Sequence, residues 1–89
     1  MEYNFNKPLF SYEEEKEIEG TNMGKLLALQ LSQATTGNPI KMMCWAIDLF
    51  KGNPIHLDEV DKKVLKDFIE NHNLIFNLAK YQLIKILEP

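Results

Sequence analysis

Apolar side chains recur at helical spacing in four stretches of the chain, about residues 23–34, 39–51, 59–71 and 74–87. The third stretch is the most regular, because one apolar stripe faces a charged side; the stripe consists of Val60, Val64, Leu65, Phe68 and Ile69. Only short loops separate the stretches, which favours antiparallel neighbours. The pattern therefore predicts one mainly α domain in 89 residues, with a small four-helix core over residues 21–89.

The second stretch is apolar almost all the way round and lies between two copies of the tetrad Gly-Asn-Pro-Ile, at Gly37–Ile40 and Gly52–Ile55. In each copy, glycine can end one element, asparagine can cap the next, and proline fits a first turn. We interpret the copies as two similar helix junctions and not as an internal repeat. Between them only Lys41, Asp48 and Lys51 are polar. Such a helix must be surrounded, either by its own fold or by a partner.

Residues 1–20 form an N-terminal arm for which two interpretations remain open. Tyr3–Asn6 alternates apolar and polar residues, as a short strand does. Ser11 and Glu14 match a capping box and would start a helix. Residues 12–18 also alternate, however, and as an edge strand they would pair with Tyr3–Asn6 in a β-hairpin. We favour an extended or β-hairpin arm.

Charge is distributed unevenly along the chain. Residues 12–19 hold one lysine and five glutamates, a net of −4, whereas the whole chain carries −3; the glutamates are Glu13, Glu14, Glu15, Glu17 and Glu19. Such a surface would dock a basic partner in a salt-sensitive way. The chain contains no arginine and its lysines are scattered, so nucleic-acid binding is unlikely.

The residues that usually carry catalysis or bind metals are sparse. His56, His72 and Cys44 are the only residues of their types and do not have the spacing of a zinc site. We interpret Cys44 as a buried structural thiol, which suits the reducing cytoplasm. No apolar run approaches the roughly 20 residues of a membrane span. We therefore expect a non-enzymatic cytoplasmic protein without cofactor, metal or membrane partner.

The second and fourth stretches carry more apolar surface than the other helices of so short a chain can cover. We expect this excess to form an interface with a second copy of the chain, with another protein, or with both. The candidate interface residues are Met42, Met43, Trp45, Phe50, Phe76 and Tyr81. Aromatic residues often anchor interfaces, so Trp45 or Phe50 would be the anchor.

A small nucleotide ligand is the alternative partner. Lys25, Lys41 and Lys80 would lie near its phosphates, and Trp45 or Tyr81 would stack on its base. Lys25 also follows a glycine-containing helix start, where backbone N–H groups can bind an anion. The absence of arginine weakens this alternative.

Several short motifs together resemble small uncharacterised helical proteins of tailed phages and prophages. They are Lys7–Leu9, Gly24–Leu27, Gly37–Lys41, Trp45–Ala46, Leu57–Asp58 with Asp61, and Lys80–Ile84. The resemblance implies a viral accessory role in the host cytoplasm, as an assembly helper or a host-interaction factor. It also admits an anti-defence role, in which the protein sequesters a nucleotide or blocks a host defence enzyme through its acidic arm. It assigns no functional residues.

Overall fold

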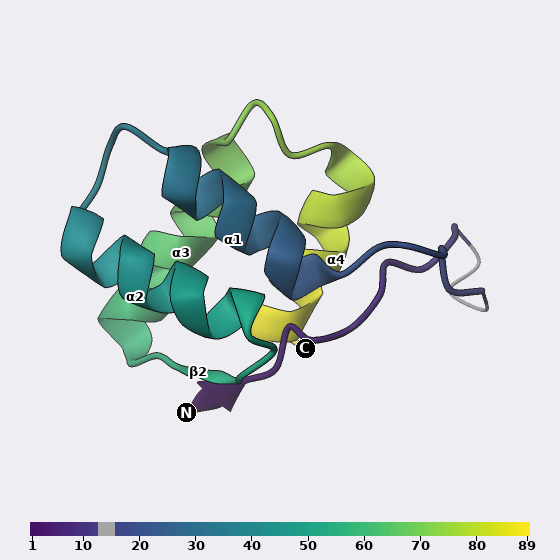
Figure 1. The fold of residues 1–89 in the computed structure, drawn as a ribbon, viewed down its shortest axis with the longest axis horizontal. Coiled ribbons are helices and arrows are strands. Elements are labelled where there is room, and N and C mark those ends of the chain that lie inside the picture. Colours follow the sequence, from purple (N-terminus) through teal and green to yellow (C-terminus); the bar gives the residue numbers. More distant parts are fainter. Residues whose placement is uncertain (13–15) are drawn as a thin grey trace.

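The computed structural model describes residues 1–12 and 16–89 and confirms a mainly α fold. Its elements, in chain order, are β1 (Glu2–Tyr3), α1 (Met23–Gln33), α2 (Pro39–Phe50), β2 (Ile55–His56), α3 (Glu59–Asn71) and α4 (Asn77–Leu87). Helices α1 and α2 lie side by side in front of α3, and the N-terminal arm projects from the body beyond α4 (Figure 1). The predicted four-helix core with an extended arm is therefore correct.

Side-chain caps start three of the helices. Asn22, Asn38 and Asp58 each accept a hydrogen bond from the backbone N–H three residues later, at 2.9, 3.1 and 2.7 Å. Each cap satisfies one of the N–H groups that a helix leaves unpaired in its first turn. Pro39 follows Asn38 at the first helical position, where its missing N–H costs nothing. These boundaries are local, and the sequence predicts them to within a residue.

The second Gly-Asn-Pro-Ile tetrad ends α2 and does not start another helix. Gly52 has a φ of +80° and donates its N–H to the carbonyl of Leu49 at 3.1 Å. The next N–H, of Asn53, reaches back to the carbonyl of Asp48 at 2.9 Å. This pair of bonds is a Schellman motif, which requires the left-handed backbone that glycine adopts without strain. The chain then enters β2, so the two tetrads are the two ends of α2.

The arm makes two antiparallel pairings, and neither is the predicted one. Tyr3 pairs with Ile55 in an antiparallel two-stranded sheet, so the predicted pairing of Tyr3–Asn6 with residues 12–18 is wrong. Both side chains are buried, and this burial favours the long-range pairing. A hairpin forms later in the arm, where the N–H of Ile18 donates to the carbonyl of Leu9 at 2.8 Å. Glu14, and with it the capping-box interpretation, lies outside the described residues.

The first part of the arm completes the N-terminus of α1. The N–H of Gly24 donates to the carbonyl of Phe5 at 2.9 Å, and that of Met23 to the carbonyl of Lys7 at 2.8 Å. A Cβ on Gly24 would lie only 3.0 Å from the carbonyl oxygen of Leu49, so a larger residue would push arm and helices apart. These first-turn N–H groups are already paired, and the anion site considered at this helix start is absent from the described structure.

A buried glutamine fastens the arm to α4. Gln82 accepts a hydrogen bond from the N–H of Phe10 at 2.9 Å and donates one to the carbonyl of the same residue at 2.8 Å. Nearby, the N–H of Leu9 donates to the hydroxyl of Thr21 at 2.9 Å. One side chain thus satisfies both backbone groups of Phe10, as a neighbouring strand would. The arm is consequently held where it leaves the body.

Helix α4 begins at Asn77, three residues later than predicted. Phe76, at its N-cap, makes no side-chain capping bond. Ile75 is buried just before the helix, and its N–H donates to the carbonyl of His72 at 3.3 Å in the turn that precedes α4. His72 ends α3 as expected, and its ring nitrogen lies 2.8 Å from the side-chain oxygen of Gln30.

The inner face of α2 is core, which corrects two of the predicted interface residues. Trp45 is 7% exposed and Met42 is 6% exposed, and Ala46 and Leu49 are buried on the same face. Both Trp45 and Met42 pack in the central cluster with the buried residues of α1 and α3. Trp45 therefore cannot be the anchor of a surface interface.

Replacing Trp45 by alanine should destabilise the fold. Losing a buried tryptophan side chain typically lowers the free energy of unfolding by about 3–5 kcal/mol. Urea denaturation followed by circular dichroism measures this change. Tyr12→Ala is the matched control, because Tyr12 is 93% exposed and its loss should cost less than about 0.5 kcal/mol. Equal losses in the two variants would contradict the placement of Trp45 in the core.

Candidate functional site

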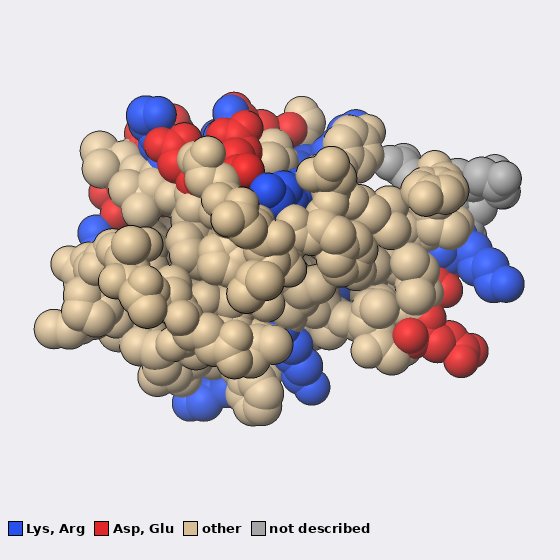
Figure 2. All heavy atoms as spheres, turned by 90° about the horizontal axis from the view of Figure 1, so that it is seen from above, with Lys and Arg blue, Asp and Glu red and all other residues tan. Residues whose placement is uncertain are grey.

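An open apolar groove runs between α1 and the outer side of α2. Its volume is about 470 Å³. Its lining residues are Lys25, Ala28, Leu29 and Ser32 of α1, and Met43, Ala46, Ile47, Phe50 and Lys51 of α2 and its end. Seen from above, the molecule shows a broad uncharged face, with acids and lysines along its upper edge and at the right, and further lysines along its lower edge (Figure 2).

The groove exists because α2 has two apolar faces and the fold covers only one. Met43, Ile47 and Phe50 follow helical spacing and lie on one side of the helix, away from the core face. All three are exposed, and so is Leu29 across the groove on α1. A contiguous apolar surface of this kind usually marks an interaction site.

Positive charge is concentrated at one end of the groove. The first turn of α1 meets the last turn of α2 there, which brings Lys25 and Lys51 to the same end. The ammonium group of Lys25 lies 5.6 Å from the centre of the Phe50 ring, within range of a cation–π contact. Among the described lining residues, these two lysines are the charged ones. The groove therefore suits a partner that is apolar along its length and acidic at one end.

The remaining predicted interface residues divide between two surfaces. Met43 and Phe50 line the groove. Phe76 and Tyr81 lie elsewhere, around a second hollow of about 510 Å³ that Tyr12 of the arm also borders. The predicted set is therefore not one continuous interface.

Among the groove residues that sequence reasoning did not single out are Leu29, Ile47 and Lys51. Ile47 lies four residues after Met43 and three before Phe50, so helical spacing from those two residues could have identified it. Leu29 looked like part of the core stripe of α1. Only the packing of α1 against α2 shows that Leu29 faces solvent.

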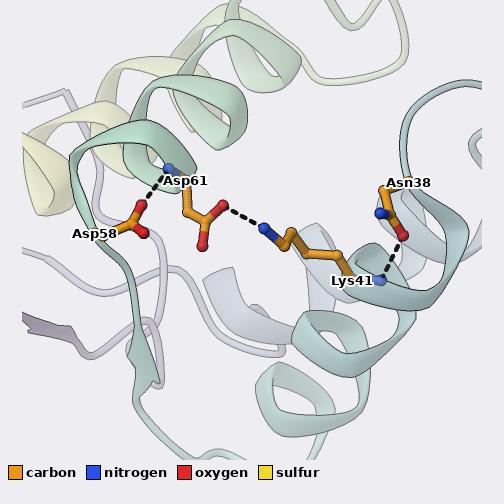
Figure 3. A network of polar contacts seen from close by, with 4 residues as sticks. All are labelled: Asn38, Lys41, Asp58 and Asp61. Carbon is orange, nitrogen blue, oxygen red and sulfur yellow. Dashed lines mark hydrogen bonds and ion pairs between the residues drawn. The ribbon is translucent and has the colours of Figure 1, made fainter.

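The three candidate phosphate-binding lysines do not converge. Lys41 lies 2.7 Å from a carboxylate oxygen of Asp61, and this ion pair joins α2 to α3 (Figure 3). The hydrogen bond that Lys41 donates to Asp61, together with the negative charge of Asp61, raises the pKa of Lys41 above the ordinary value of 10.5. Lys80 donates to the backbone carbonyl of Glu70 at 2.9 Å. Lys25 opens α1, at the opposite end of the helix pair from Lys41.

The predicted nucleotide site is therefore not assembled from Lys25, Lys41 and Lys80. Trp45, one of its two stacking candidates, is buried in the core. Tyr81 is exposed, but the ammonium group nearest its ring belongs to Lys85, at 5.5 Å from the ring centre.

Part of the predicted acidic surface is described. Glu17 and Glu19 are exposed on the arm, beside exposed Tyr12 and Ile18. Glu13, Glu14 and Glu15 lie outside the described residues. Docking through these acids stays a prediction.

Cys44 corrects another expectation, because its thiol is exposed and not buried. By helical spacing it lies on the same side of α2 as exposed Lys41 and Asp48. An apolar run cannot show which of its residues faces inward. Residues 1–12 and 16–89 contain no group of three or more His, Cys, Asp or Glu side chains placed to hold a metal ion. No helix in this described part of the chain is long and apolar enough to cross a bilayer.

Lys41→Met should lower the melting temperature at neutral pH, because it removes the link between α2 and α3. A raised pKa means that the ion pair stabilises the folded state below pH 10.5 and that this contribution is lost as the pH rises further. Thermal melts at neutral and strongly alkaline pH measure the difference. Lys63→Met is the control, since Lys63 pairs with Asp67 within one exposed helix at 3.3 Å. An equal decrease in melting temperature in Lys41→Met and Lys63→Met would contradict a stabilising role for the ion pair between α2 and α3.

Comparison of the chain with family models, with curated proteins and with solved structures finds no match.

Proposed function

We propose that this protein is a non-enzymatic, self-associating protein-binding module that acts through the groove between α1 and α2. The observation that carries the proposal is the uncovered outer face of α2, where Met43, Ile47 and Phe50 stand exposed around a groove of about 470 Å³. Grooves between two helices accept peptide segments through a few apolar anchors. A phage-type accessory role, in assembly or in contact with a host protein, fits such a module.

The apolar surface of the groove predicts a weak association. Burying an apolar side chain completely contributes about 1.5–3 kcal/mol. The four large groove residues are about half exposed, so each would add roughly 1 kcal/mol on binding. The total is near the lower limit of the cost of association, which is about 4–15 kcal/mol. Association therefore needs a further contribution, and it should depend on concentration.

Nucleotide sequestration is the less well supported function. Lys41 is committed to Asp61, and Trp45 is not accessible to a base. The other alternative is also a protein-binding function: the acidic arm would dock on a host enzyme and inhibit it.

Removing the groove anchors should abolish self-association. The double variant Ile47→Ser with Phe50→Ser alters residues that are 48% and 64% exposed, so the fold should persist. Light scattering after size exclusion, from about 1 μM to about 1 mM, should show the wild-type mass rising with concentration while the variant remains monomeric.

The matched control is Val60→Ser with Val64→Ser on α3, at residues that are 71% and 42% exposed and outside the groove. This control should associate like the wild type. A wild-type monomer throughout the range would overturn self-association, and equal weakening of both double variants would overturn the role of the groove.

A further inference from the structure

We infer that the groove binds the acidic arm of a second copy of this chain, so that copies associate head to tail. This inference rests on the proposed function, because it identifies the partner that occupies the same groove. Here "acidic arm" means the described residues of the hairpin tip, Ser11–Tyr12 and Lys16–Glu19.

The charges of the two surfaces are complementary. Lys25 and Lys51 make one end of the groove positive. The described residues of the acidic arm hold Glu17 and Glu19 against Lys16, within a stretch of the sequence, residues 12–19, that carries five glutamates and one lysine in all. Glu17 and Glu19 are exposed, and no salt bridge in the described structure involves either residue. Ion pairs with the lysines of another copy would supply the contribution that apolar burial lacks.

The arm also offers apolar side chains to the groove. Tyr12 is 93% exposed, and Ile18 is exposed as well. The hairpin bonds from Ser11 to Lys16 (2.9 Å) and from Ile18 to Leu9 (2.8 Å) keep the base of the arm narrow. A narrow two-stranded segment with an exposed aromatic residue matches an open groove lined by Phe50 and Ile47.

The arm cannot occupy the groove of its own chain in the arrangement described. The paired bonds between Gln82 and Phe10, and the bond from Leu9 to Thr21, hold the arm where it leaves the body. From there it projects beyond α4, away from the outer side of α2 (Figure 1). Docking must therefore be intermolecular.

Each copy would then carry one arm and one groove at different places on its surface. An interface between two different surfaces of the same chain leaves one arm and one groove free at the ends of every short assembly. Association therefore extends to rings or open chains and does not stop at a two-fold dimer. Such growth suits the assembly role proposed above.

Charge reversal tests the inference directly. The arm variant is Glu17→Lys with Glu19→Lys, and the groove variant is Lys25→Glu with Lys51→Glu. All four side chains are exposed, so the fold should persist. Sedimentation equilibrium should show the dissociation constant rising about tenfold or more in each variant. The arm variant removes the net negative charge of residues 12–19, and the groove variant places two acids opposite an acidic arm.

Combining all four substitutions is the decisive variant. The fourfold variant reverses two acids and two lysines, so its net charge stays at the wild-type value of −3. The two arm substitutions bring the net charge of residues 12–19 from −4 to 0. The acidic groove end then no longer faces an acidic arm, and the substituted positions again offer side chains of opposite sign to each other. Association should therefore recover relative to the groove variant. The control Glu59→Lys with Glu70→Lys changes two exposed acids on α3 by the same charge and should associate like the wild type or more tightly.

The outcomes separate the inference from the proposed function. Weakening by the groove variant alone would overturn the arm as occupant and leave the groove as the binding site of a symmetric copy or an acidic helix of another protein. Failure of the fourfold variant to recover would also overturn the inference. Unchanged association in every variant, including Ile47→Ser with Phe50→Ser, would overturn both.

Discussion

The structure depends on how α2 is buried. Trp45, Met42 and Leu49 fill the core from one face of this helix, and they hold α1 and α3 against it. A second, neighbouring face with Met43, Ile47 and Phe50 is also apolar, and no helix of the described residues covers it. The same composition that builds the core therefore creates the groove. Removing the exposed apolar residues would leave the core intact, so their presence needs an explanation outside the monomer.

The N-terminal arm is the second structural component that links fold and proposed function. Its first half is part of the body, because Phe5 and Leu9 are buried and the carbonyl of Phe5 completes the first turn of α1. Its second half projects from the body and carries the acidic charge. Gln82 lies at the boundary and holds Phe10 by two backbone bonds. A base held by these bonds can present the exposed Glu17 and Glu19 to another molecule without a large loss of entropy on binding.

Sequence reasoning identified the features that depend on neighbouring residues. Asn22, Asn38 and Asp58 cap helices through bonds to residues three positions away, so the sequence alone predicts these helix starts. The pairing of Tyr3 with Ile55 joins residues far apart in the chain, and no local pattern specifies it. For a similar reason Trp45, which was predicted at an interface, is buried, whereas Phe50, predicted with it, is exposed. A helix that is apolar all round does not show which face packs inward until its neighbours are placed.

The most direct test of the groove compares two adjacent methionine methyl groups by nuclear magnetic resonance during a dilution series. Met43 faces the groove and is exposed, whereas Met42 is buried in the core. We expect the Met43 methyl signal to shift with increasing protein concentration while the Met42 signal remains constant. If the mass increased with concentration while the Met43 signal stayed unchanged, the protein would associate through another surface. The claim that the groove is the binding site would then be wrong.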